Sequence, residues 1–128
     1  MLQHLARPLG RRVEFLGRVD EEDVGDLFRR AGIVLLPYRT LFSASGPLAQ
    51  AIGHATPFVI SEELRPLCPS WPHWAGPDPG EWARALRALM RDEAVRVTAG
   101  TLAAALAQDC GWPRAAERTL EIYRAVLC

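Results

Sequence analysis

One polar loop carries the residues best suited to binding an anion. Arg39 supplies a positive charge, Ser43 and Ser45 supply hydroxyl groups, and Gly46 has no side chain that would keep a ligand from the backbone. Ser45 and Gly46 precede Pro47, a pattern typical of a helix start, where free N–H groups and the helix dipole favour phosphate. The loop therefore predicts a phosphate site. The alternative is that Ser45 only caps the helix and Gly46 only fits a tight turn.

Other polar side chains give weaker indications of chemistry. His54 lies nine positions after Ser45 on the expected helix, so the two face different directions, which argues against a catalytic triad. His73 stands between Pro72 and Trp74, where a lone histidine is more often structural than a ligand or base, and we assign it no role. The acids from Asp20 to Asp23 could suggest a magnesium site, but they also fit the positive first turn of a helix, and we favour the helix. The tryptophans could stack on sugars or bases, but we favour a role in the core for all four, Trp71, Trp74, Trp82 and Trp112.

Composition excludes several classes of function. The chain has 128 residues with 15 basic and 15 acidic side chains, and therefore a formal net charge of +0. This balance lacks the positive charge of a nucleic-acid-binding protein, so we expect no nucleic-acid partner. Every basic side chain is arginine, and the absence of lysine excludes a Walker-type loop and Schiff-base chemistry.

Cysteine usage and hydropathy bear on the compartment. Cys68, Cys110 and Cys128 form no CxxC pair, so neither a disulfide framework nor a thiolate zinc site is indicated. The apolar runs fall far short of the roughly 20 residues of a membrane span, and the start does not resemble a secretory signal. We expect a cytoplasmic protein without an integral membrane segment.

Hydrophobic patterning predicts an α/β fold in a single Rossmann-like domain over residues 1–128. The runs Ile33 to Leu36 and Pro57 to Ser61 have no polar face, which is typical of parallel strands covered by helices on both sides. Val13 to Leu16 and His73 to Ala75 are expected as shorter strands, giving a partial parallel sheet of about four strands flanked by helices. After the strong start signal at Asp78, the chain is expected to end in helices.

The order of these pieces resembles a known family. The strings are V-E-F-L-G-R-V from Val13 to Val19, A-G-I-V-L-L-P-Y from Ala31 to Tyr38, and S-G-P-L-A-Q-A-I-G-H-A-T-P-F-V-I-S from Ser45 to Ser61. Gly111-Trp112 and Tyr123 agree with the closing helices of the same family. The chain is similar to the C-terminal half of the group 1 GT-B retaining glycosyltransferases.

This resemblance implies a domain that binds the nucleotide diphosphate of an activated sugar, while an N-terminal domain holds the acceptor. Such enzymes are metal-independent, so no cofactor or metal is expected, and a helix N-terminus and Arg39 would carry the diphosphate. Ser45 and Gly46 match the turn near the donor phosphates and sugar. Gln50 matches the position of a glutamate that binds the ribose.

The chain also departs from the family pattern. Phe42 and Gln50 stand where the family has its two glutamates, so neither acid of the pair is present. The resemblance further implies an N-terminal domain and two strands ahead of Val13, so the chain is expected to be truncated on that side. We therefore expect either that the Val13 strand moves beside Ile33 to Leu36, or that a second copy or another chain covers this exposed edge.

Two functions follow as hypotheses. The first is a donor-binding fragment of a glycosyltransferase, inactive in transfer by itself. The alternative is a non-catalytic interaction module derived from such an enzyme, which the two lost acids favour. A receiver-like signalling domain is set aside because that family needs a lysine.

Overall fold

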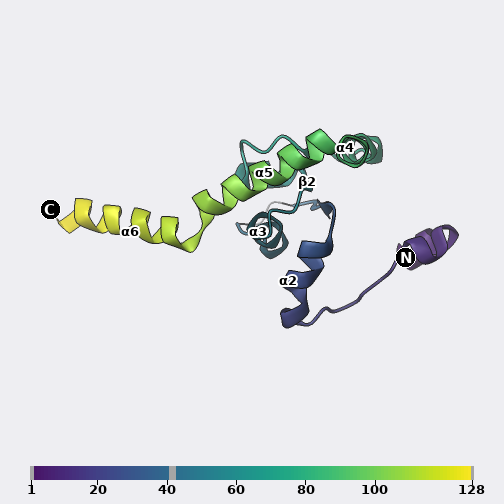
Figure 1. Ribbon diagram of the computed structural model, residues 1–128, viewed down its shortest axis with the longest axis horizontal. Helices are drawn as coiled ribbons and strands as arrows, with labels where there is room; N and C mark the ends of the chain where they lie inside the picture. Colours follow the sequence, from purple (N-terminus) through teal and green to yellow (C-terminus); the bar gives the residue numbers. More distant parts are fainter. Residues whose placement is uncertain (1, 41–42, 128) are drawn as a thin grey trace.

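The computed structural model describes residues 2–40 and 43–127 of the chain. Its elements follow the expected alternation of helices and strands (Figure 1). They are α1 (Leu2–Ala6), η1 (Arg7–Arg12), α2 (Glu21–Arg30), β1 (Val34–Leu36), α3 (Gly46–Gly53), β2 (Phe58–Ser61), η2 (Glu62–Leu67), β3 (Trp74–Ala75), α4 (Pro79–Arg91), α5 (Glu93–Cys110) and α6 (Trp112–Leu127).

The strands form one parallel sheet in the order β1-β2-β3. Val34 pairs with Phe58 across the first ladder, and Ile60 pairs with Trp74 across the second. All four residues of β2 are buried, as expected for a strand with a partner on each edge and helices over its faces. The prediction of a parallel α/β sheet flanked by helices and followed by C-terminal helices is confirmed.

The sheet has three strands within the described residues, one fewer than the predicted number of about four. The segment Val13 to Leu16 forms no strand; it runs in extended form between the N-terminal helices and α2, away from the sheet (Figure 1). Its side chains are exposed, Phe15 by 48%. An isolated extended segment finds no ladder of hydrogen bonds, so hydrophobic alternation alone did not make it a strand.

The outer edge of β1 therefore has no strand beside it among residues 2–40 and 43–127. The expectation that the Val13 segment moves into this place is wrong. The backbone of Val34 points to β2, where its N–H donates to the carbonyl of Pro57 at 2.9 Å. Since alternate residues of a strand direct their backbone groups to opposite edges, Leu35 presents its N–H and C=O to the open side.

The core lies around β2 and the helices that cover it. Phe58, Ile60, Leu64 and Leu89 are fully buried. Trp71 stacks on Phe58 with 3.8 Å between the ring centroids, and its indole N–H donates to the carbonyl of Phe58 at 3.1 Å. This pair joins the loop after η2 to the central strand by both packing and a buried hydrogen bond.

The other tryptophans differ from the expectation that all four lie in the core. Trp82 is partly buried, and Trp74 is 39% exposed beneath the guanidinium of Arg65, which lies 4.2 Å from the ring centroid. Trp112 is 89% exposed, so its prediction as a core residue is wrong. Its apolar surface found no neighbouring element to pack on, which periodicity within a single helix cannot reveal.

Helix capping follows the sequence signals in most places. The hydroxyl of Ser45 accepts from the N–H of Leu48 at 3.3 Å, and the carboxylate of Asp78 accepts from the N–H of Gly80 at 3.1 Å. Asp20 occupies the N-cap of α2, but its side chain accepts no capping hydrogen bond. The acids that follow it lie in the first turn of the helix, as expected.

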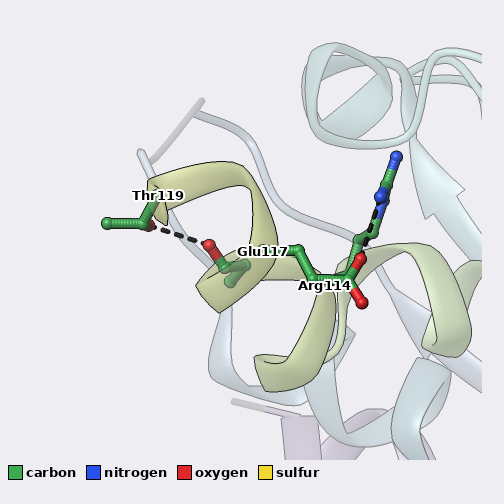
Figure 2. A network of polar contacts seen from close by, with 4 residues as sticks. Arg114, Glu117 and Thr119 are labelled. Atoms are coloured by element: carbon green, nitrogen blue, oxygen red, sulfur yellow. Dashed lines mark hydrogen bonds and ion pairs between the residues drawn. The ribbon is translucent and has the colours of Figure 1, made fainter. Parts of the chain in front are cut away.

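Helix α6 extends away from the sheet and carries no buried residue (Figure 1). Its polar face is held by local contacts (Figure 2): Arg114 forms an ion pair with Glu117 at 3.0 Å, and the hydroxyl of Thr119 donates to the carbonyl of Ala115 at 2.8 Å. The hydrogen bond to Glu117 raises the pKa of Arg114. No helix within the described residues is long and apolar enough to cross a membrane.

Replacing Trp71 with phenylalanine should destabilise the protein by about 1–3 kcal/mol, because the carbonyl of Phe58 loses its buried donor and the core loses ring volume. The measurement is urea unfolding followed by circular dichroism. Trp112→Phe is the matched control, since the exposed indole should contribute little. Equal stability losses in the two variants would contradict the assignment of the core.

The stability of the protein should fall as the pH drops through the unfolded-state pKa of histidine, about 6.5. Burial lowers the pKa of His73, so the folded state binds fewer protons there than the unfolded state, and the stabilisation present at higher pH is lost on acidification. Urea unfolding between about pH 7.5 and 5.5 should show a smaller slope for His73→Phe. An unchanged slope in His73→Phe would contradict the prediction.

Candidate functional site

The carboxyl ends of the three strands meet at one edge of the sheet and enclose a pocket. Its volume is about 430 Å³, and it is lined by residues that follow β1, by the last residue of β2, and by residues of the β3–α4 connection. We call it the carboxyl-end pocket; its lining residues are Pro37, Tyr38, Arg39, Ser61, Glu63, Gly76, Pro77 and Trp82. Ligands of open α/β sheets bind at this edge, because the loops there join strands to helix N-termini.

One wall of the carboxyl-end pocket is fixed by a double contact to Gly76. The N–H of Gly76 donates to Glu81 Oε2 at 2.6 Å, and the indole N–H of Trp82 donates to the carbonyl of Gly76 at 2.9 Å. A Cβ at position 76 would lie 2.8 Å from the same carboxylate oxygen, so any larger residue there would displace the Glu81 carboxylate from this position. The first turn of α4 is thereby held against the end of β3.

A second contact ties the pocket to the start of α3. The hydroxyl of Ser45 donates to the phenolic oxygen of Tyr38 at 3.4 Å while it caps the helix. Tyr38 lines the pocket and Ser45 precedes the first residue of α3. The loop after β1 is therefore fixed at its two ends, by the strand and by the helix cap.

The structure distributes the predicted phosphate-site residues between the pocket and α3. Arg39 lines the carboxyl-end pocket, and Ser43 is exposed in the loop. Gly46 is the first residue of α3, and a Cβ built on it meets no described atom within 4 Å. Gln50 is exposed one helical turn later, on the same side of α3 as Gly46. Phe42 lies outside the described residues.

Sequence reasoning missed several residues that build the pocket. Ser61, Glu63 and Trp82 line it, and Gly76 closes it, although none of them was proposed as a site residue. For Ser61 a signal exists, because it is the one hydroxyl residue that ends the apolar run of β2 at the ligand-binding edge. For the others the signal is absent, since their proximity depends on the connection between β3 and α4.

A larger cavity, of about 770 Å³, lies between α2 and the extended segment that precedes it. Its lining includes Glu14, Asp20, Asp23 and Arg30, and it is remote from the carboxyl ends of the strands, because α2 enters β1 from the opposite edge. An extended segment without a sheet partner supplies one of its sides. We therefore place the functional site at the carboxyl-end pocket and the adjoining start of α3.

Thiol and metal chemistry find little support in the side chains that the structure describes. Burial, together with the neighbouring Cys110, raises the pKa of Cys68, which keeps this thiol protonated and poorly nucleophilic. Within the described part of the chain, no group of three or more His, Cys, Asp or Glu residues could hold a metal ion. The polar groups that remain at the site are hydroxyls, one arginine, one glutamate and backbone N–H groups.

The curated proteins that this chain matches are glycosyltransferases. D-inositol 3-phosphate glycosyltransferase of Streptomyces avermitilis is 33% identical over 98% of this chain and 28% of its own length. Proteins of the same name from Pseudarthrobacter chlorophenolicus and Kineococcus radiotolerans are 36% identical over 78% of the chain and 52% identical over 36% of it. These matches cover 25% and 11% of the two relatives. No protein-family model matches the chain.

The three-stranded parallel sheet flanked by helices defines the chain as an α/β protein. The chain is a relative of the glycosyltransferases, and the resemblance that its motifs indicated is confirmed. It spans about 28% of the length of the first relative named above, and so corresponds to one part of such an enzyme.

Replacing Glu81 with alanine should destabilise the protein by about 1–3 kcal/mol, because the buried N–H of Gly76 loses a charged acceptor. Glu62→Ala is a close control: Glu62 is an exposed neighbouring acid that accepts no hydrogen bond from a described residue, and its loss should cost less than about 0.5 kcal/mol. Chemical denaturation of the three proteins measures the difference. Similar values for Glu81→Ala and the wild type would contradict the role of this contact.

Proposed function

We propose that this chain is the donor-binding part of a glycosyltransferase and holds the nucleotide diphosphate of an activated sugar. The likeness to glycosyltransferases over 98% of the chain carries this proposal. The placement of a built pocket and a helix start at the carboxyl ends of parallel strands supports it, since nucleotides bind at this edge of Rossmann-like sheets.

The diphosphate is proposed to lie at the N-terminus of α3. Pro47 has no N–H and the N–H of Leu48 is used by the Ser45 cap, so the backbone N–H of Gly46 is the group proposed to meet a phosphate, and the open space around Gly46 leaves room for phosphate oxygens. Arg39 and Ser43 belong to the loop that leads into this turn and would add a countercharge and a hydroxyl. These groups can neutralise a leaving diphosphate without a metal ion, which is the mode we propose.

Gln50 is proposed to bind the ribose. It lies one turn from Gly46 on the exposed side of α3, so a nucleoside attached to a phosphate at the helix start can reach it. An amide can accept and donate hydrogen bonds with ribose hydroxyls, although it is a weaker acceptor than the carboxylate of a glutamate.

The acceptor and the remaining catalytic groups are proposed to come from a further domain or a second chain. The relatives are more than three times as long as the region they share with this chain. The open edge of β1 is where such a partner, including a second copy of this chain, would continue the sheet. The isolated chain is expected to bind the donor without transferring the sugar.

Calorimetry against UDP, GDP and ADP tests the proposal. We expect binding of at least one of them, and a loss of about tenfold in affinity in Gly46→Ala, because the added methyl group obstructs the approach of phosphate to the helix start. The substitution leaves the fold intact, since the new Cβ meets no described atom within 4 Å. Gly53→Ala, in equally open space at the other end of α3, is the matched control and should bind like the wild type.

Absence of heat with all three nucleotides at millimolar concentration would overturn the proposal. If the native protein also co-purified with a larger protein, the alternative of a non-catalytic interaction module would replace it. If Gly46→Ala and the wild type bind a nucleotide with equal affinity, the phosphate does not bind at the start of α3.

A further inference from the structure

Helix α6 has an apolar face that the described part of the chain leaves exposed. The helix extends away from the sheet and contains no buried residue (Figure 1). Its large exposed apolar side chains are Trp112, Leu120, Ile122, Tyr123, Val126 and Leu127. A contiguous apolar face of this kind on a surface helix marks a place where another molecule or element binds.

The spacing of residues along this face is that of paired helices. A stripe of four residues is separated by four, three and four positions; we call it the α6 stripe, and it consists of Ala116, Leu120, Tyr123 and Leu127. Alternating spacings of three and four positions are the pattern by which one helix packs lengthwise against another. The partner that fits the α6 stripe is therefore a second helix.

The charged residues beside the α6 stripe match a second copy of the same helix. Glu117 directly follows Ala116 and Arg124 directly follows Tyr123, so an acid and a base lie on the same flank of the stripe. A two-fold axis between two antiparallel copies of α6 brings this flank of one copy against the same flank of the other. Glu117 of one copy then faces Arg124 of the second copy, and the reverse pair forms at the same time.

Both charged groups can take part in such a contact. Arg124 forms no ion pair within residues 2–40 and 43–127. Glu117 uses Oε2 for Arg114 (Figure 2), and its other carboxylate oxygen can accept from a second guanidinium. In the same antiparallel arrangement, Leu120 of one copy lies beside Tyr123 of the second copy, and Ala116 lies beside Leu127 of the second copy.

The polar side of α6 does not favour a membrane surface as the partner. Helices that lie on membranes carry a strongly basic polar face. On α6 the basic residues are balanced by acids, since the charged residues are Arg114, Glu117, Arg118, Glu121 and Arg124. This mixture suits pairing between like helices better than attraction to anionic lipid.

We propose that α6 pairs antiparallel with α6 of a second copy and makes the chain a two-fold symmetric dimer. The proposal rests on the α6 stripe and on its self-complementary flank, and it does not depend on nucleotide binding. Because α6 extends away from the sheet, this surface is distinct from the open edge of β1 (Figure 1). One helix of 16 residues from each copy forms a small interface, so the dimer is concentration-dependent.

Analytical ultracentrifugation of the 128-residue chain tests whether this dimer forms. The wild type should pass from monomer to dimer over a range of roughly 1 to 500 μM. Leu120→Asp should weaken dimerisation by about tenfold or more, because a carboxylate enters the apolar seam. Ala125→Asp adds the same acid on the exposed side of α6 opposite the stripe, and should dimerise like the wild type. Circular dichroism and urea unfolding check that both variants stay folded, as expected for a helix without buried residues.

Charge reversal tests the antiparallel arrangement. Glu117→Arg puts arginine against arginine across the interface, and Arg124→Glu puts glutamate against glutamate, so each variant alone should dimerise about tenfold more weakly at low salt. An equimolar mixture of the two variants should form a heterodimer with nearly the wild-type affinity, because every arginine then faces a glutamate. Arg118→Glu reverses a charge away from this flank and is the matched control, which should dimerise like the wild type.

Three outcomes would overturn the proposal. A wild type that stays monomeric at the highest concentration leaves the α6 face to another partner, which is a membrane if the protein co-sediments with vesicles of phosphatidylcholine and phosphatidylserine. A dimer that persists in Leu120→Asp is held by another surface, such as the open edge of β1. Charge-reversal variants that do not dimerise when mixed would show that the helices do not pair antiparallel. Calorimetry with nucleotides has no bearing on these outcomes, so this inference and the proposed function fail separately.

Discussion

The whole arrangement depends on the burial of β2 between two parallel neighbours. A strand that is buried at all four residues must have its backbone hydrogen bonds satisfied on both edges, and β1 and β3 supply them. Parallel pairing brings the carboxyl ends of all three strands to the same edge. This constraint, rather than any contact between site residues, places Arg39, Ser61 and Gly76 around one pocket.

Local contacts then turn this edge into a shaped site. Gly76 is held between Glu81 and Trp82, and Tyr38 is held by Ser45. In both cases a side chain from the start of a helix contacts the connection that follows a strand. The rigid parts of the site thus come from helix starts, which hold the loops that follow β1 and β3 in place.

Much of the fold and part of the candidate site could be predicted from the sequence. Ile33 to Leu36 and Pro57 to Ser61 were predicted as buried parallel strands because apolar runs without a polar face fit only a strand covered on both sides. The Ser45 cap followed from its pattern with Gly46 and Pro47. Ser61 was missed although it visibly ends an apolar run, because its place in the pocket wall depends on residues that other elements bring beside it.

By itself, the sequence determined the α/β class, the helix starts and the relationship to glycosyltransferases, since these depend on local patterns and on the order of motifs. Only the tertiary structure decided which segments pair. Val13 to Leu16 alternates like a strand yet finds no edge, and Trp112 is apolar yet 89% exposed. The reason is physical: a strand and a core residue are each completed by a partner from elsewhere in the chain, and local sequence does not specify whether that partner is present.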